Sequence, residues 1–203
     1  MRKIVVLSFV SLDGVMQAPG GSEEDKAEGF KYGGWTFPYF DEESGKEMGK
    51  QISGELDLLL GRKTYDIFAS YWPHQDPKDN PVAGPFNKAR KYVVSHGSPE
   101  LSWENSELIS GDVVAKLKEL KGQDGPVLQV HGSSKLIQTL LQNDLVDELW
   151  LKTFPVILGK GKRLFDDNAV PHTWELTYSN ITPSGVIFAN YKRAGEVKTG
   201  SFA

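Results

Sequence analysis

Residues 127–142 read VLQVHGSSKLIQTLLQ, and this stretch decides the fold. Its first five residues predict a strand, and the Gly-Ser-Ser at 132–134 marks the point where a helix begins. Leu136, Ile137, Leu140 and Leu141 then recur at helical spacing, so the helix buries one face. A strand that passes directly into an amphipathic helix is the repeating unit of α/β proteins.

The rest of the chain repeats this unit on both sides of that stretch. The apolar patterns predict strands at about 3–12, 56–60, 91–95, 107–110, 127–131 and 147–158, and an antiparallel hairpin with arms 173–182 and 185–192. Helices are expected over 42–55, from about Lys63, after the capping residue Asp112, and from Gly132. The four prolines between 73 and 85 predict a surface loop. We therefore expect one α/β domain over residues 1–203, with a mostly parallel eight-stranded sheet covered on both faces and an antiparallel C-terminal hairpin.

The composition excludes several classes of chemistry. The 203 residues include 23 Lys and Arg against 27 Asp and Glu, a net charge of −4 that predicts neither a nucleic-acid nor a membrane partner. Cysteine is absent, so there are no disulfides, thiol nucleophiles or cysteine-ligated metals. The four histidines lack metal-binding spacing, and we expect no metal site. Reactivity must come from an organic cofactor, or from carboxylates and hydroxyls.

The first apolar run has two interpretations. Residues 1–10 could pass for a signal peptide, but the run is short, rich in β-branched residues, and followed by Asp13-Gly14 rather than by a cleavage site. A buried first strand fits better. No segment approaches the ~20 apolar residues of a membrane span, so we expect a cytoplasmic protein.

A long irregular segment follows that strand. Residues 13–40 carry six glycines together with Trp35 and other aromatics. A loop of this length in a compact domain is commonly a lid or a binding loop, whereas the alternative is a mobile insertion. The aromatic residues favour the lid, and Trp35 is a candidate to stack on a planar substrate unless it belongs to the core.

Three turns at strand ends are suited to an anion. Gly61, Arg62, Lys63 and Thr64 join a strand to a helix start, where free N–H groups and the helix dipole favour a phosphate. Gly132, Ser133, Ser134 and Lys135 form a second strand-to-helix turn, in which the serines are expected to cap the helix. Ser95 and His96 follow a third strand and could hold a ribose or an adenosine phosphate. Each turn could instead be a plain basic turn or cap, but ligands of α/β sheets bind where such strand ends meet.

These residues resemble the dihydrofolate reductase-like superfamily, and more closely its branch related to the reductase domain of riboflavin biosynthesis. The resemblance rests on SLDGVM at 11–16, GRKTYD at 61–66, VVS at 93–95 and VHGSSKLIQTLLQNDLVDELWLKTFPVILGKGKRLF at 130–165. It implies a three-layer α/β/α fold and an NADPH-dependent oxidoreductase. In such proteins the second segment binds the cofactor phosphates, the glycine of the fourth segment lies against the pyrophosphate, and the loop with Leu12 and Gly14 borders the nicotinamide and the substrate.

The resemblance also implies a reaction. A hydride would pass from the nicotinamide to a C=N or C=O group of a pterin-like or ribosylaminopyrimidine-like substrate, as in a 5-amino-6-(5-phosphoribosylamino)uracil reductase, and the protein would form a homodimer. The chain has His96 where members often have an arginine for the 2′-phosphate, so NADH stays open beside NADPH. His131-Gly132 replaces the Gly-Gly of dihydrofolate reductases.

Two carboxylates are candidate catalytic residues. Asp13 directly follows a buried strand, although it could equally be a turn aspartate bonded to its own backbone. Asp41 stands at a helix start beside Glu42 and Glu43, where the helix dipole alone explains acidic residues. The competing function is a non-catalytic nucleotide-binding or regulatory dimer that keeps the cofactor cleft.

Overall fold

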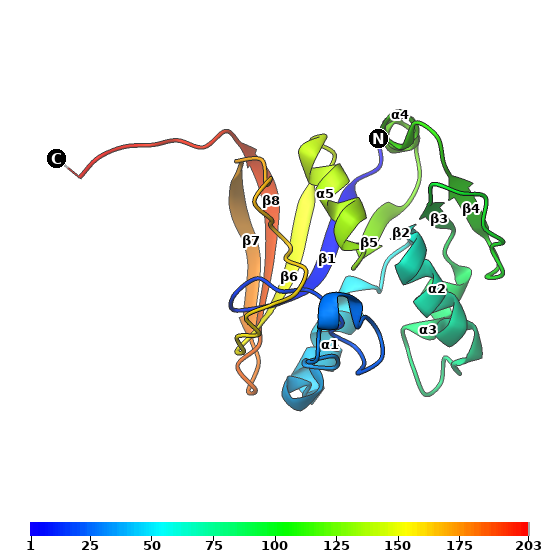
Figure 1. Cartoon of the computed structure of the whole chain (residues 1–203), viewed down its shortest axis with the longest axis horizontal. Helices are drawn as coiled ribbons and strands as arrows, with labels where there is room; N and C mark the ends of the chain where they lie inside the picture. Colours follow the sequence, from blue (N-terminus) through cyan, green and yellow to red (C-terminus); the bar gives the residue numbers. More distant parts are fainter. Residues whose placement is uncertain (203) are drawn as a thin grey trace.

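Eight strands form one sheet in the computed structural model, which describes residues 1–202. The strands are β1 (Ile4–Ser11), β2 (Leu56–Gly61), β3 (Lys91–Val94), β4 (Ser106–Ile109), β5 (Val127–His131), β6 (Glu148–Phe154), β7 (Thr173–Ile181) and β8 (Ile187–Gly195). Their spatial order is β4-β3-β2-β5-β1-β6-β8-β7 (Figure 1). The pairs from β4 to β6 are parallel, whereas β8 runs antiparallel to both β6 and β7. The predicted mostly parallel sheet with an antiparallel C-terminal hairpin is confirmed.

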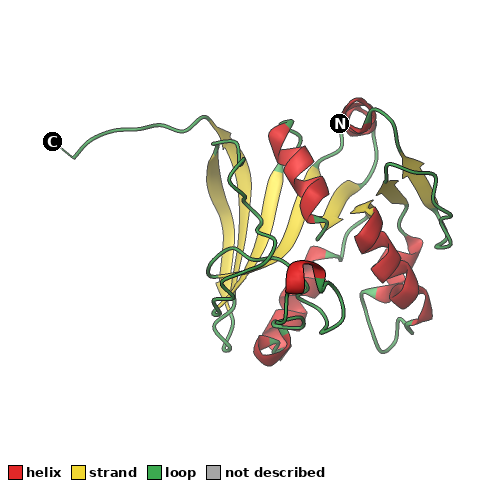
Figure 2. Ribbon diagram, in the orientation of Figure 1, coloured by secondary structure: helices red, strands yellow, loops and turns green. Residues whose placement is uncertain are grey.

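Helices cover both faces of this sheet (Figure 2). The α-helices are α1 (Glu42–Gln51), α2 (Arg62–Tyr71), α3 (Ala83–Lys88), α4 (Val113–Gly122) and α5 (Ser134–Gln142). Short 3-10 turns lie at Ala27–Gly29, Phe37–Tyr39 and Trp72–His74. Within residues 1–202, no helix combines the length and apolar character needed to cross a bilayer.

Several boundaries differ from the sequence prediction. Helix α1 ends at Gln51 rather than at residue 55, and β6 ends before Pro155, which cannot donate to a strand ladder. Part of the predicted 73–85 loop belongs to α3. Pro85 lies in the first turn of that helix, where a missing N–H costs no intrahelical bond.

The two faces of the sheet bury separate clusters. Apolar side chains of β1, β5 and β6 pack on one face against α4 and α5, including Leu117, Ile137 and Leu140. The opposite face buries residues of β2 and β3 against α2 and α3, such as Tyr65 and Phe86. This arrangement gives the expected three layers.

A third cluster lies where the long loop returns to the sheet. It gathers Val15, Phe30 and Trp35 from the loop around Phe154 and Phe188 of the sheet. The ring of Trp35 meets that of Phe154 edge to face at 5.3 Å. Apolar packing therefore fixes the loop along much of its length.

Candidate functional site

A cavity of about 950 Å³ opens at the carboxyl ends of β2, β3 and β5. All three predicted anion-binding turns contribute to its wall. The candidate cofactor residues that line it are Gly61, Arg62, Lys63, Thr64, Ser95, His96, Gly132, Ser133, Ser134 and Lys135. Parallel strands end at one edge of a sheet, which explains how turns so distant in sequence meet.

Ser133 ties two of the turns together. Its hydroxyl accepts a hydrogen bond from the Gly61 N–H at 2.9 Å and donates one to Thr64 Oγ1 at 2.8 Å. A Cβ at Gly61 would lie 3.1 Å from Ser133 Oγ, so glycine permits this close approach. The expectation that this serine caps α5 is wrong, because its side chain makes no capping bond. The hydroxyl is directed at the neighbouring turn instead.

The N-termini of α2 and α5 consequently face the cavity without side-chain caps. Neither Gly61 nor Ser133, the N-cap residues of these helices, supplies a capping side-chain bond. Gly132 and Ser133 both have left-handed backbones, with φ of 62° and 67°. Uncapped first-turn N–H groups and the helix dipoles make this wall suitable for a phosphate or another anion.

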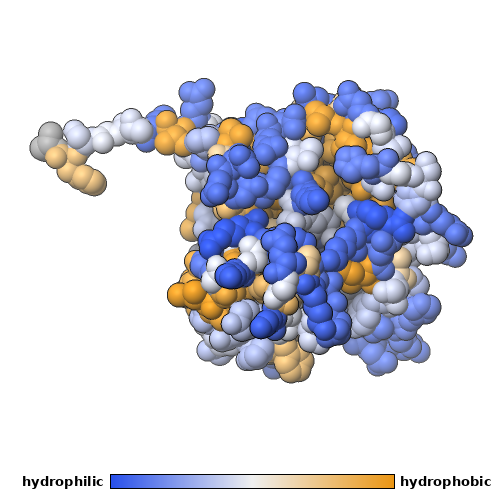
Figure 3. All heavy atoms as spheres, in the orientation of Figure 1, coloured by the Kyte–Doolittle hydropathy of each residue, from blue (hydrophilic) through white to orange (hydrophobic). Residues whose placement is uncertain are grey.

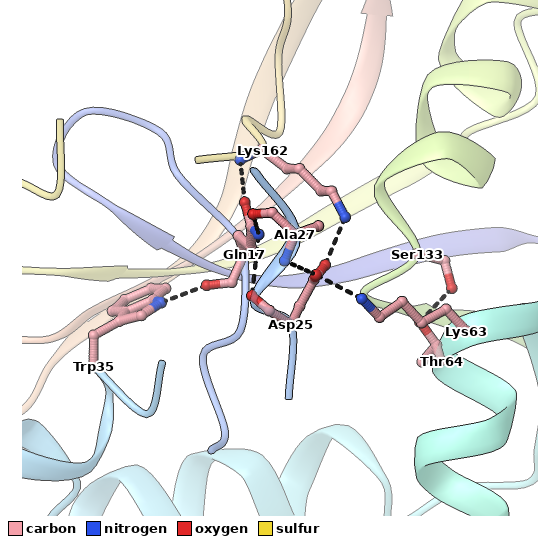
Figure 4. Close-up of polar contacts among 8 residues, drawn as sticks. All are labelled: Gln17, Asp25, Ala27, Trp35, Lys63, Thr64, Ser133 and Lys162. Atoms are coloured by element: carbon pink, nitrogen blue, oxygen red, sulfur yellow. Dashed lines mark hydrogen bonds and ion pairs between the residues drawn. The ribbon is translucent and has the colours of Figure 1, made fainter. Parts of the chain in front are cut away.

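Asp25 of the long loop lines the cavity and pairs there with two lysines. These ion pairs were not predicted from the sequence. The Asp25 carboxylate bridges Lys63 Nζ and Lys162 Nζ, each at 2.5 Å, and accepts the Ala27 N–H at 3.0 Å (Figure 4). Burial raises the pKa of Asp25, but the hydrogen bonds from Lys162 and Lys63 outweigh it and lower that pKa to about 2. The aspartate is therefore ionised at neutral pH.

Gln17 fixes the same loop from inside. Its side-chain amide donates to the carbonyls of Asp25 and Ala27, both at 3.1 Å, and its Oε1 accepts the Lys162 N–H at 2.9 Å. Its backbone carbonyl accepts the Trp35 indole N–H at 2.8 Å (Figure 4). Gln17 and Asp25 both line the cavity, so the loop borders the site.

Trp35 does not line this cavity. Its side chain is buried in the cluster around Phe154, and only 7% of the residue is exposed. The predicted stacking of Trp35 on a substrate is therefore corrected: the residue belongs to the core, and it anchors the loop through its bond to Gln17.

The structure also places Asp13 outside the cavity, together with its neighbours Leu12 and Gly14. The Asp13 carboxylate accepts the N–H groups of Leu158 at 3.1 Å and Gly159 at 2.8 Å, and the Ser11 hydroxyl at 2.6 Å. Burial raises the pKa of Asp13, but these hydrogen bonds prevail and the net shift is downward. Asp13 therefore braces the turn after β1, and its catalytic role stays a prediction.

Asp41 likewise has a structural task. It is the N-cap of α1, where it accepts the Ser44 N–H at 2.8 Å, and its other oxygen accepts the Ser184 N–H at 3.0 Å. The bond from Ser44 is the largest cause that lowers the pKa of Asp41. Asp41, like Asp13, does not line the cavity.

Two basic residues on the sheet lie deeper in the cavity wall. His131 Nε2 lies 2.9 Å from Gln129 Oε1, and Gln129 Nε2 donates to the Gln51 carbonyl at 2.8 Å. Burial, followed by the charge of Lys152, lowers the pKa of His131 to about 3, so this imidazole is neutral at pH 7. Lys152 lies on β6 and is only 3% exposed. The alternation of apolar residues in β6 did not predict that this lysine is buried.

A parallel sheet with a ligand-sized cavity beyond its strand ends defines an α/β protein of the kind that binds small molecules at this edge. The family model of the RibD C-terminal domain matches residues 2–188, and the chain belongs to this family.

Two curated relatives match most of the length of the chain. The chain is 27% identical over 190 residues to the "Uncharacterized protein YyaP" of Bacillus subtilis (strain 168), covering 92% of each chain. It is 26% identical over 172 residues to YwjB of the same organism, covering 82% of this chain and 84% of that one.

Two solved structures share the fold. A "Putative riboflavin biosynthesis protein" from Shewanella sp. PV-4 superposes with a TM-score of 0.68 at 20% identity, over 95% of this chain and 99% of that one. A pyrimidine reductase-like protein from Corynebacterium diphtheriae gives 0.66 at 15% identity, over 96% and 93%.

Proposed function

We propose that this protein is an NADPH-dependent reductase that transfers a hydride to a C=N or C=O group of a planar heterocycle, pterin-like or ribosylaminopyrimidine-like. One observation carries the proposal: three strand-end turns, two of them joined through Ser133, line a single cavity of about 950 Å³. Membership of the RibD C-terminal domain family and the pyrimidine reductase-like neighbour support the same reaction class.

The residues present fit a dinucleotide. The uncapped N-termini of α2 and α5 offer N–H groups to a pyrophosphate, and Gly61 and Gly132 let the cofactor approach the backbone. Lys63 and Thr64 add a charge and a hydroxyl, and Ser95 and His96 offer polar groups to a ribose or its phosphate from the same cavity wall. When bound, the reduced nicotinamide supplies the hydride, and the protein orients the reactants and excludes water.

The basic residues of the wall favour the phosphorylated cofactor. Arg62, Lys63 and Lys135 line the cavity beside His96. Arg62 is paired with Asp66 across one helical turn at 2.7 Å, on an exposed face where such a pair is weak and easily exchanged for a phosphate. NADPH is therefore the expected cofactor, and NADH the weaker one.

Titration of the protein with NADPH and NADH tests the proposal. Trp72 lines the cavity, so energy transfer from tryptophan to the nicotinamide reports binding. We expect saturable NADPH binding that weakens about tenfold or more in Lys135→Ala, since a charge-assisted bond is worth roughly 1.5–3 kcal/mol. Lys116→Ala, on the outer side of α4, is the matched control and should bind as the wild type does. Failure to bind either nucleotide at millimolar concentration refutes the proposal.

A non-catalytic nucleotide-binding protein is the second candidate. The observation that favours it is the position of Asp13 and Asp41, both of which lie outside the cavity. NADPH binding without oxidation across a panel of pterins and aminopyrimidines distinguishes this function from a reductase.

We further infer that two copies associate through β7, the edge strand. Leu176 is 52% exposed and Ile181 is 67% exposed on this strand. The face in Figure 3 is largely hydrophilic, with hydrophobic residues gathered in separate patches. An apolar strand edge is a common site of pairing between chains. Light scattering that gives the mass of one chain at micromolar concentration would exclude the homodimer.

A further inference from the structure

The cavity holds a buried lysine that the cofactor turns do not use. Lys152 stands opposite Phe9 of β1 and Phe188 of β8 in the sheet register. Met48 and Gln51 of α1 line the same cavity. Lys152 also lines it and is 3% exposed. The polar end of this side chain is therefore enclosed by the same walls as the ligand space.

Within residues 1–202, Lys152 Nζ has neither a hydrogen-bond acceptor nor a carboxylate partner. Its one described contact is with the ring of Phe9, whose centroid lies 5.6 Å away. Lys91 shows what a satisfied buried lysine looks like in this protein. Its Nζ donates to the carbonyls of Asn87 at 2.7 Å and Glu104 at 3.1 Å. The same Nζ lies over the Trp103 ring, 4.2 Å from the ring centroid. An ammonium without such partners in an apolar wall is costly, so an anion bound in the cavity would stabilise the charged form of Lys152.

The carboxylates that line the cavity are bound elsewhere. Asp25 is held by Lys63 and Lys162, and Asp112 caps α4 through the Ala115 N–H. Glu24 accepts the N–H groups of Gly20 and Gly21. No carboxylate in the described lining is thus left to pair with Lys152.

The surroundings of Lys152 bring its pKa close to neutral pH. Burial lowers the pKa of Lys152 to about 7, and no neighbouring charge offsets this effect. From α1, the cavity receives Met48 and Gln51, which do not titrate, and from β5 it receives the neutral His131. The titratable groups of the lining are Glu24, Asp25, Arg62, Lys63, His96, Asp112, His131, Lys135, Lys152 and Lys162.

We propose that Lys152 is the counter-charge for an acidic oxygen on the substrate ring, so that this end of the cavity selects planar heterocycles that bind as anions, such as enolates or ring-imide anions. The inference rests on the proposed function, because it concerns the substrate of that same site. A ring seated against Phe9 and Met48 would place its acidic oxygen beside the ammonium, where an ionic hydrogen bond is strengthened by the apolar walls.

Barbiturate and uracil form a matched pair of probes, since the two share a pyrimidine ring and only barbiturate is an anion between pH 6 and 8. Their binding is measured by calorimetry on the full chain without nucleotide, so the result does not depend on NADPH binding. We expect barbiturate to bind about tenfold or more tightly than uracil at pH 6. The preference should shrink as pH rises through 8, because Lys152 loses its charge while barbiturate keeps its own.

Two variants show which part of the cavity is responsible for the preference for barbiturate. Lys152→Met replaces the ammonium with an apolar chain of similar length and should abolish the preference at every pH. Lys135→Met removes a lysine from the cofactor turns and should retain it. If the preference is lost in Lys135→Met but kept in Lys152→Met, the probe binds at the turns and the proposal is refuted. Equal binding of the two probes to the wild type, or no binding of either, also refutes it, whereas the NADPH titration decides the proposed function separately.

Discussion

Replacement of Lys152 by methionine should stabilise the protein, and the gain should depend on pH. The pKa of Lys152 is about 7 in the folded chain, against 10.5 for an unburied lysine. The unfolded chain therefore binds more protons between these two values, so folding stability rises with pH across that window. With ~1.36 kcal/mol for each unit of pKa difference, the penalty in the wild type is on the order of 5 kcal/mol at pH 6 and about 2 kcal/mol at pH 9. It falls below about 1 kcal/mol at pH 10.

Urea unfolding at pH 6, 8 and 10, followed by tryptophan fluorescence, measures this difference. Lys152→Met should gain most at pH 6 and almost nothing at pH 10, with an unchanged denaturant slope. Lys91→Met is the matched control, because it also removes a buried ammonium but leaves two carbonyls without their donor. Its gain at pH 6 should be smaller. A difference between Lys152→Met and the wild type that stays constant from pH 6 to 10 would show that Lys152 is not charged inside the fold.

Three further substitutions test the geometry of the site and its loop. Asp25→Asn should lower the free energy of unfolding by roughly 2 kcal/mol at pH 6. In the wild type this stabilisation is present above pH 3.8 and is lost as the pH falls through about 2. The same substitution should tighten NADPH binding, because it releases Lys63 from its ion pair, and unchanged affinity would contradict that competition. Ser133→Ala should lose about 1–3 kcal/mol and weaken NADPH binding, measured by urea unfolding and by the nucleotide titration. Gly161→Ala should lower the melting temperature, because its Cβ would stand 2.6 Å from a packed side chain at a φ of 132°. Gly49→Ala in α1, with open space around it, is the control and should be neutral or slightly stabilising.

The three strand-end turns that line the cavity could be predicted from the sequence, because the signals for them are local. A strand, a glycine and a helix start are each encoded within a few residues, as in Gly61–Thr64 and Gly132–Lys135. The convergence of these turns follows from one rule of parallel sheets, namely that their carboxyl ends share an edge. No pairwise contact had to be known in advance.

The ion pairs and the buried lysine of the cavity could not be predicted from the sequence, because they depend on contacts between residues far apart in the chain. Asp25 and Lys162 lie 137 residues apart, and nothing in either local sequence indicates that they meet. Lys152 lies in a strand where alternation does not show which face is covered. Asp13 and Asp41 stood at strand and helix boundaries, where a carboxylate can serve either a ligand or the backbone, and in both cases the backbone N–H groups bind it.

The central position of β1 has a consequence for synthesis of the chain. Ile4 pairs with Leu128 and Val5 pairs with Glu148, so both neighbours of β1 are made long after it. At ~5–20 residues per second, the apolar residues 4–10 wait on the order of ten seconds for their partners. During that interval the nascent chain exposes an apolar, β-branched segment that is prone to pair with other chains, so slower translation should increase its demand for chaperones.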